Sequence, residues 1–525
     1  MQKLSTIKDI DIKNKTVFMR VAFDVPLDPT KNLLDSKRIR DDSRIQDVIP
    51  TLSYLIDNNC KIILSGGWLG RPKGEDPDLS MAPVALRLQE LLKEEGLLKH
   101  PVLLTPNCLD GSKPRSVYKN KDEVKREISK LQAGQVILLE NVRYDAEANA
   151  NDEKFAEFMA SLAGNNAIYV NEAEAQNHRP EATITNVPKL IAKRGGKAVF
   201  GFKVADVIKY LGNISKLLGK KERGPFIFFL AGKKIETQIG ITSKITVTHA
   251  LLDKMKEGDI IFIQGAVTYT FLAAEKFLDV IGQNYDEIEN IIDDYNRKIK
   301  DEIYKSGKDS SQAANIQEQL QKQKSDKIKE VTGATDTKIK SLIGNSYAEW
   351  KEIGEQIFFA AQLYLKAKAK KVAVMTSIDH TITDKYPNKF GNLPKDAEIK
   401  SFNSAVGIPE GWLGIAPGPK SLEIICKNVK KAYMLILAGP LSIEEPRVEE
   451  FSKTNKKLFD VIREVKNKGA VTIAAGGDTA AVVKSYNGED AFTVVSNAGG
   501  ATLELIEKNG RLPGIESVEK TWHKI

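Results

Sequence analysis

Cysteine is scarce in this sequence: only three of its 525 residues, Cys60, Cys108 and Cys426, carry a thiol. They lie far apart and are odd in number, which indicates free thiols rather than a set of disulfides. No spacing of cysteine and histidine residues resembles a zinc-binding pattern. We therefore expect reduced, buried cysteines and a location in the cytoplasm or another reducing intracellular compartment.

Long apolar runs are also missing. No stretch reaches the roughly 18 apolar residues of a membrane-spanning helix, and the first residues lack the hydrophobic segment of a secretion signal. The net charge is only +8, and no basic stripe with interleaved aromatic residues occurs. We therefore expect neither a membrane nor a nucleic acid as partner, while the mild positive charge suits a small anionic ligand.

Apolar runs typical of buried strands alternate with glycine-rich turns and helical stretches. The predicted strands are residues 16–23, 61–64, 136–139, 167–170, 226–230, 259–263, 371–375, 432–437 and 471–473. Residues 203–218 are predicted to form one connecting helix, and residues 411–419 a tight loop. The alternation predicts an α/β fold with parallel sheets, and the length suffices for two or more domains.

Three arginines, Arg71, Arg143 and Arg179, stand at or just past the ends of predicted strands. Ligands of open α/β sheets bind outside the carboxyl ends of the strands, and guanidinium groups bind phosphate or carboxylate in bidentate fashion. One such arginine alone is more often a local ion pair, but several at equivalent positions indicate an anion site. Arg20 lies inside the first strand, so we expect it to have a carboxylate or phosphate partner.

A glycine turn at residues 474–480 reads Ala-Ala-Gly-Gly-Asp-Thr-Ala between an apolar strand and a helical stretch. Such a turn directs backbone N–H groups and the positive end of the helix at an anion, and Gly476 and Gly477 permit a close approach. Asp478 can meet a metal bound to phosphate, and Thr479 can cap the helix or donate to an oxygen. The same pattern is also common as a simple tight turn.

Residues 284–341 break the α/β alternation, because they are rich in Lys, Asp, Glu and Gln and show no strand pattern. Apolar side chains recur there at helical spacing: Tyr285, Ile288, Ile292, Tyr295, Ile299 and Ile303. A polar turn is expected at residues 307–314, so the segment is interpreted as an inserted helical hairpin. The hairpin is a solvated decoration, packs on its host domain, or docks a protein partner, and the sequence leaves these alternatives open.

Several motifs together resemble the phosphoglycerate kinase family in order and spacing, over nearly the whole chain apart from the insertion. They are Arg20–Pro26, Leu69–Pro72, Leu138–Arg143, Gly411–Gly414, Ala438–Pro440, Gly476–Ala480 and Leu512–Gly514. The resemblance implies two Rossmann-like lobes with parallel sheets, joined by a helical hinge. The expected parts are a lobe at 1–202, a connecting helix at 203–222, a nucleotide-side lobe at 223–510 containing insertion 284–341, and a tail at 511–525 returning to the first lobe.

The resemblance also implies a reaction and its residues. A phosphoryl group would pass from 1,3-bisphosphoglycerate to ADP, giving 3-phosphoglycerate and ATP, with magnesium on the nucleotide. The residues implied for catalysis are Arg44, Lys234 and Gly477, and those implied for the phosphoglycerate are Arg71, Arg143, Arg179 and Asp24. The nucleotide would contact Gly232, Lys234, Gly439, Pro440, Glu445, Gly476, Gly477, Asp478 and Thr479, with Asp478 as the metal ligand.

The sequence departs from the family pattern at positions near both ligands. The departures are Ala22, Asp24, Trp68, Glu174, Glu181, Ala231, Gln238, Ala438, Ala475 and Ala498. They remove positive charge, add carboxylates and replace glycines, and phosphoryl transfer depends on positioned positive charge. We therefore expect weak or absent turnover, with the nucleotide side better retained. The alternative is a non-catalytic structural or regulatory subunit, docked through 284–341 into a larger cytoskeletal or organellar assembly.

Overall fold

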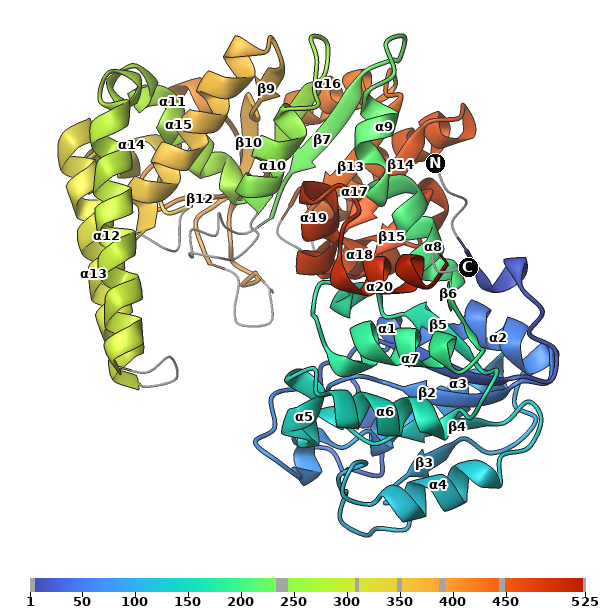
Figure 1. Cartoon of the computed structure of the whole chain (residues 1–525). Helices are drawn as coiled ribbons and strands as arrows, with labels where there is room; N and C mark the ends of the chain where they lie inside the picture. Colours follow the sequence, from blue (N-terminus) through green and yellow to red (C-terminus); the bar gives the residue numbers. More distant parts are fainter. Residues whose placement is uncertain are drawn as a thin grey trace. The chain divides into compact units, whose positions relative to one another are not determined.

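The computed structural model describes residues 5–232, 244–306, 311–346, 352–386, 393–442 and 449–522. The chain forms two compact units, Met1–Asn213 with Lys508–Ile525, and Ile214–Glu507 (Figure 1). Each unit is built on a parallel sheet of six strands with helices packed on it, and the second unit also holds a small three-stranded sheet. The boundary at Asn213 falls within the segment that was expected to connect two lobes.

The sheet of the first unit has the strand order β3-β4-β2-β1-β5-β6, and its neighbours pair in parallel. Its strands are β1 (Thr16–Val21), β2 (Lys61–Ser65), β3 (Leu103–Thr105), β4 (Val136–Leu139), β5 (Ile168–Glu172) and β6 (Lys197–Phe200). Its longer helices are α2 (Ile49–Asp57), α3 (Ala82–Glu94), α4 (Lys121–Ser129), α6 (Glu153–Leu162) and α7 (Val187–Lys193), with short α1 (Ser43–Gln46), α5 (Ala146–Asn149) and α8 (Phe202–Val207). The apolar strand residues are buried on both sides, as continuous apolar runs in a parallel sheet require.

The last helix, α20 (Pro513–Trp522), packs on the first unit. The Trp522 indole N–H donates to the carbonyl of Ala198 at 2.6 Å, and the Gly514 N–H donates to the carbonyl of Asn177 at 3.0 Å. A Cβ at Gly514 would overlap the Asn177 side chain, so a glycine is needed at this contact.

The large sheet of the second unit has the strand order β15-β14-β13-β7-β8-β9, again parallel. Its strands are β7 (Phe226–Leu230), β8 (Ile260–Ile263), β9 (Ala373–Met375), β13 (Met434–Ala438), β14 (Val471–Ala475) and β15 (Val494–Ser496). The small antiparallel sheet contains β10 (Asp379–Thr383), β11 (Ile399–Asn403) and β12 (Leu413–Pro417). The helices are α9 (Ile214–Leu218), α10 (Lys244–Leu252), α11 (Val267–Gln283), α15 (Ile353–Ala369), α16 (Pro419–Val429), α17 (Glu449–Asn467), α18 (Gly477–Ser485) and α19 (Gly499–Glu507).

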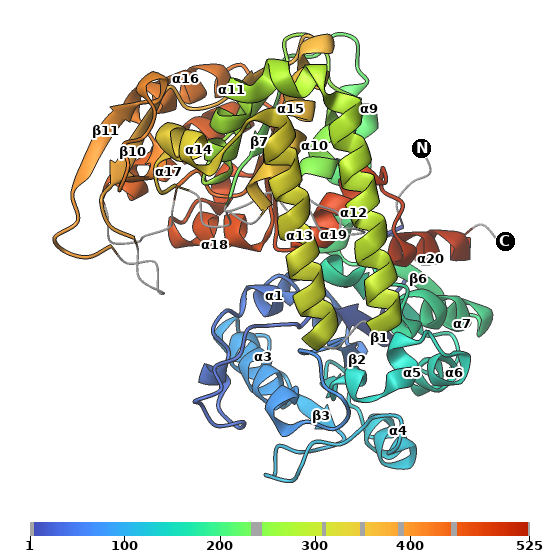
Figure 2. The same cartoon turned by 90° about the vertical axis from the view of Figure 1, so that its left-hand side faces the viewer.

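The inserted segment forms α12 (Tyr285–Ser306), α13 (Ser311–Thr332) and α14 (Asp336–Ile343). Helices α12 and α13 lie side by side in both views, and α13 also packs on α15 (Figures 1 and 2). Ile288 and Ile299 of the predicted apolar stripe, and Ile328 of α13, are at most 2% exposed. These apolar side chains therefore pack within the unit. Tyr304, in the last turn of α12, is 92% exposed.

Several predicted boundaries were wrong. Helix α13 already begins at Ser311, so residues 311–314 are helical rather than part of a turn. The expected single helix at 203–218 is divided into α8, a π-helix at Ile208–Gly212 and α9. The Asn213 side chain donates to the carbonyl of Ile208 at 3.0 Å, and such side-chain bonds compete with continuation of a helix.

The expected loop at 411–419 contains strand β12, which pairs with β10. Short strands rich in glycine and proline lack a local signal, because their hydrogen-bond partners come from another part of the chain. The sequence also did not predict β3, β6, β10, β11 and β15, which have only three to five residues each and are too short to show a clear periodic pattern.

Cys60, Cys108 and Cys426 are buried and form no disulfide, as expected. Within the described ranges no helix combines the length and apolarity needed to cross a membrane.

Candidate functional site

Four arginines of the first unit, Arg44, Arg71, Arg143 and Arg179, form what we call the arginine cluster. Arg143 lies in the short turn after β4, and burial lowers its pKa while the charges of Arg71 and Arg179 act in the same direction. The carboxylates of Glu181 and Asp24 oppose this shift. Arg71, Arg143 and Arg179 follow β2, β4 and β5, which lie within four adjacent strands of the sheet, so the carboxyl ends of these strands bring the three residues to one edge. Arg44 joins them through Asp24, which it contacts and which also acts on Arg143.

The members of the arginine cluster differ in how far their guanidinium groups are already bound by other protein groups. The Arg44 guanidinium donates to the carbonyl of Asp24 and lies 4.0 Å from the Asp24 carboxylate. The guanidinium groups of Arg71 and Arg179 are exposed and make no hydrogen bond or ion pair within the described part of the chain. Arg71 and Arg179 therefore present the freest positive charge.

Trp68 covers Arg143. The Arg143 guanidinium carbon lies 4.4 Å from the centre of the Trp68 ring, a cation–π distance, and its Nη1 donates to the carbonyl of Gly70 at 2.6 Å. The indole thus occupies one face of the guanidinium and the backbone engages one of its edges. Fewer donors of Arg143 remain for a ligand than the sequence alone indicates.

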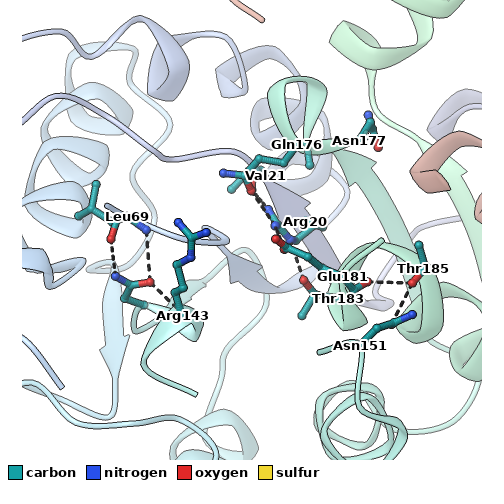
Figure 3. A network of polar contacts seen from close by, with 12 residues as sticks. Arg20, Val21, Leu69, Arg143, Asn151, Gln176, Asn177, Glu181, Thr183 and Thr185 are labelled. Atoms are coloured by element: carbon teal, nitrogen blue, oxygen red, sulfur yellow. Dashed lines mark hydrogen bonds and ion pairs between the residues drawn. The ribbon is translucent and has the colours of Figure 1, made fainter. Parts of the chain in front are cut away.

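Arg20 in β1 is fully buried and, as expected, has an acidic partner: the Glu181 carboxylate at 3.2 Å (Figure 3). Its Nε donates to the Thr183 hydroxyl at 2.9 Å, its Nη2 to the Gln176 side chain at 2.6 Å, and its Nη1 to the carbonyl of Val21. Burial lowers the pKa of Arg20 and raises that of Glu181, while their mutual attraction opposes both shifts. The partner of Arg20 is therefore part of the protein.

In the second unit, the predicted glycine turn follows β14 and opens α18. Gly476 has a φ of 104°, a conformation that favours glycine, and a Cβ at Gly476 or Gly477 would meet only van der Waals contacts of 3.9 and 3.7 Å. Asp478 is exposed in the first turn and makes no hydrogen bond or ion pair with a described residue. The start of α18 therefore offers backbone donors without crowding by side chains at its two glycines, and an unengaged carboxylate that suits a magnesium ion.

Thr479 does not cap α18, which corrects one of the expected roles. The residue before the helix is Gly476, and no side chain caps it. The Thr479 hydroxyl is buried, donates to the carbonyl of Ala475 at 2.9 Å and accepts from the Gly439 N–H at 2.8 Å. Thr479 thus joins the ends of β14 and β13 and holds the turn in place.

Gly232 and Gly439 have φ values of 116° and 115° where β7 and β13 end, and Pro440 follows Gly439. A Cβ at Gly439 would overlap the carbonyl of Ala231, so these two strand ends require glycine to pack together. Lys244 at the start of α10 donates to that carbonyl at 2.5 Å. The sequence did not indicate Lys244, because no motif surrounds it.

Three positions of interest, Lys234, Gln238 and Glu445, lie outside the described residues. The structure also shows partners that motif reading missed, Gln176 and Thr183 on Arg20. The available signal was their position on either side of Arg179, in the short helical turns after β5. Across the described ranges, no group of three or more His, Cys, Asp and Glu side chains is arranged to hold a metal by itself.

Comparison with known proteins agrees with this architecture. The chain is similar to curated proteins named phosphoglycerate kinase from Thermosipho africanus, with 31% identity over 519 residues, and Acidobacterium capsulatum, with 30% over 520. These alignments cover 99% of this chain and 98% and 99% of the two relatives. The solved structures of phosphoglycerate kinase from Coxiella burnetii and Pyrococcus horikoshii share its fold, with TM-scores of 0.62 and 0.63 at 22% and 19% identity and 99% of this chain covered.

The family model described as Phosphoglycerate kinase matches residues 7–347 and 337–509, which is nearly the whole chain. The similarity to solved structures confirms the expected two-domain α/β fold with parallel sheets. From the strand-end arginines, the glycine turn after β14 and these matches, it follows that the chain belongs to the phosphoglycerate kinase family.

Proposed function

We propose that this protein is a phosphotransferase of the phosphoglycerate kinase type, in which transfer between 1,3-bisphosphoglycerate and ADP is weak or lost. The observation that supports loss is the buried Arg20–Glu181 ion pair, because it commits one arginine to an internal carboxylate. Trp68 over Arg143 adds to it. Phosphoryl transfer relies on positive charge that is free to meet the moving oxygens, so each engaged arginine lowers the rate.

Binding of Mg-ADP or Mg-ATP belongs to the same proposal. The missing side chains at Gly476 and Gly477, and the unengaged Asp478 carboxylate, suit a phosphate with its metal at the start of α18. Magnesium would neutralise charge on the nucleotide phosphates when bound. Gly232, Gly439 and Pro440 would shape the neighbouring wall, with Lys234 and Glu445 in their family roles. On the other unit, Arg44, Arg71, Arg143, Arg179 and Asp24 would meet the phosphoglycerate.

A coupled assay with 1,3-bisphosphoglycerate and Mg-ADP tests the proposal. We expect turnover lower by about 10²-fold or more than that of an active phosphoglycerate kinase measured in parallel. Asp478→Ala should abolish any residual turnover and weaken Mg-ADP binding in calorimetry. Asp279→Ala removes another exposed carboxylate of the second unit, in α11, and should change neither. Turnover equal to the reference enzyme would refute the loss of activity, and no heat with Mg-ADP would refute nucleotide binding.

The alternative function is a non-catalytic subunit that docks through the hairpin α12–α13 into a larger assembly. The observation that favours it is the 92% exposure of Tyr304, a large aromatic side chain at the end of α12. Tyr304→Ser tests it better than deletion of 284–341, because that deletion would remove the buried Ile288 and Ile328. A defined partner should co-purify with the wild type and with Val406→Ser, a control for another exposed apolar residue, but not with Tyr304→Ser.

A further inference from the structure

All three nitrogens of the buried Arg20 guanidinium are engaged by protein groups. Its Nε, Nη1 and Nη2 all donate to protein oxygens, and a Cβ at Gly67 would overlap Nη1 and the Gln176 side chain. The backbone at Gly67 therefore lies directly against the guanidinium. A phosphate or carboxylate from solution therefore has no access to Arg20 in this arrangement. Arg143, drawn beside it in Figure 3, is only half-buried and remains partly accessible.

The Glu181 carboxylate forms an ion pair with Arg20 and does not cap the helix that follows it. Glu181 precedes the π-helix Ala182–Asn186 and makes no capping bond to it, while its backbone carbonyl accepts from Thr185. Its Oε2 pairs with Arg20, and its Oε1 is buried without a hydrogen-bond partner among the described residues. Since Arg143 and Arg179 also lower the pKa of Glu181, its charge reaches the arginine cluster.

We propose that Glu181 is a specificity-determining residue: its carboxylate stands in for an anionic ligand at Arg20 and weakens binding of phosphate or sulfate by Arg143 and Arg179. An anion approaching Arg143 or Arg179 meets the negative charge of Glu181 in a partly desolvated setting, where repulsion is screened less than in water. The inference rests on the proposed function only in treating the arginine cluster as an anion site.

The test is calorimetric titration of the full-length protein with sulfate at pH 7.5 and low ionic strength. Glu181→Gln keeps the shape of the side chain and removes its charge, and we expect it to bind sulfate at least about tenfold more tightly than the wild type. Glu157→Gln removes the same charge from the exposed side of α6 and should bind like the wild type. Equal affinities in the two variants would overturn the proposal.

The same variant has a readout in unfolding. Because Glu181→Gln leaves Arg20 buried without a counter-charge, its melting temperature should fall, and sulfate should raise it more than that of the wild type. A smaller sulfate effect in the variant than in the wild type would contradict the proposal.

A second test measures the sulfate affinity of His178→Gln as a function of pH. It needs no Glu181 variant, so it still decides the question if Glu181→Gln does not fold. The groups that face Glu181 are Arg20, Arg143, Arg179 and Tyr169, and burial raises the pKa of Tyr169 further above the tested range. His178, near them in sequence, is removed by the substitution. Because burial raises the pKa of Glu181, acidification from pH 7.5 to 5 shifts its carboxyl toward the neutral form, so sulfate binding should tighten. An affinity that does not rise would overturn the proposal.

The binding tests and the turnover assay can refute the role of Glu181 and the proposed function independently of each other. Normal turnover of the wild type would refute the loss of activity, yet Glu181→Gln would still bind sulfate more tightly if Glu181 acts as proposed. Conversely, a silent assay with unchanged sulfate affinity in Glu181→Gln would leave the proposed function intact and refute the role of Glu181.

Discussion

Two buried carboxylates of the first unit, Glu172 and Glu181, differ in what stabilises their charge. Glu181 has an arginine partner, whereas Glu172 accepts from the Thr51 hydroxyl at 2.5 Å and from the N–H groups of Lys203 and Val204 at 3.1 Å. These bonds favour the charged form of Glu172, but burial outweighs them and raises its pKa to about 7. Glu172 therefore titrates near neutral pH.

The stability of the first unit should depend on pH through Glu172. Its pKa is higher in the folded than in the unfolded state, so its contribution is complete below the unfolded value and is lost as pH rises towards 7. We expect Glu172→Gln to remove up to about 3 kcal/mol of the wild-type decrease in unfolding free energy between pH 4.5 and 7.5. Urea unfolding measures this, with Glu157→Gln as control, and parallel pH profiles of wild type and Glu172→Gln would contradict it.

Trp68 should restrain Arg143 rather than contribute to anion binding. Loss of the ring in Trp68→Ala removes a cation–π contact of about 0.5–2 kcal/mol, and we expect sulfate affinity to rise a few-fold as Arg143 becomes available. Trp68→Phe keeps an aromatic face and should stay close to the wild type. Calorimetry checks both variants, and weaker binding in Trp68→Ala would show that the indole supports the ligand instead.

At the scale of elements, the inserted hairpin is held on its host by a buried ion pair. The Lys324 ammonium of α13 lies 2.7 Å from the Glu355 carboxylate of α15 and 3.0 Å from the side-chain oxygen of Asn296 in α12. Gln321 donates to the second oxygen of Glu355 at 2.7 Å. Both charges are satisfied, so the pair specifies how three helices meet.

Breaking this pair on one side should be costly. Lys324→Met leaves Glu355 buried without its counter-charge, and we expect a loss of about 3–5 kcal/mol in unfolding free energy and faster hydrogen exchange in α13. Lys327→Met breaks an exposed pair with Glu330 on the same helix and should cost less than about 1 kcal/mol. The double variant Lys324→Met, Glu355→Met should recover most of the loss, and equal effects of the two single variants would disprove the anchoring role.

At the scale of the whole molecule, the last helix of the chain completes the first unit rather than the second. Helix α20 packs on α7 and β6. It is attached there by hydrogen bonds from the Trp522 side chain and from the Gly514 backbone N–H. The first unit therefore joins two segments that are distant in the sequence, and its stability depends on the contacts of α20.

Disturbing α20 should loosen the first unit selectively. In Gly514→Ala the new Cβ overlaps Asn177, and we expect a cost of about 1–3 kcal/mol with faster hydrogen exchange in α7 and β6. Strands β13 and β14 should be unaffected. Gly499→Ala, where a Cβ meets no atom within 4 Å, is the matched control. Equal exchange changes in both sheets would argue against a local role of α20.

The strands of the two large sheets show which elements the local sequence pattern can predict. Residues 136–139 and 226–230 were predicted with the bounds of β4 and β7, because strands buried on both faces read as unbroken apolar runs. Strand β12 was missed, since its partner residues in β10 are 30 or more positions away and its own glycine and proline resemble a loop. The arginines at strand ends were found from the same alternation that predicted the sheets.

The sequence by itself determined the α/β class, the family, the inserted hairpin and the arginines and glycine turn that carry a site, because these follow from local periodicity and from motifs. Only the tertiary structure decided which charges are free. Arg20 and Glu181 are 161 residues apart and meet because β1 and β5 are neighbours in the sheet. The Thr479 hydroxyl turns to Ala475 and Gly439 for a similar reason. A side chain's partner is chosen by burial and packing, which sequence spacing does not encode.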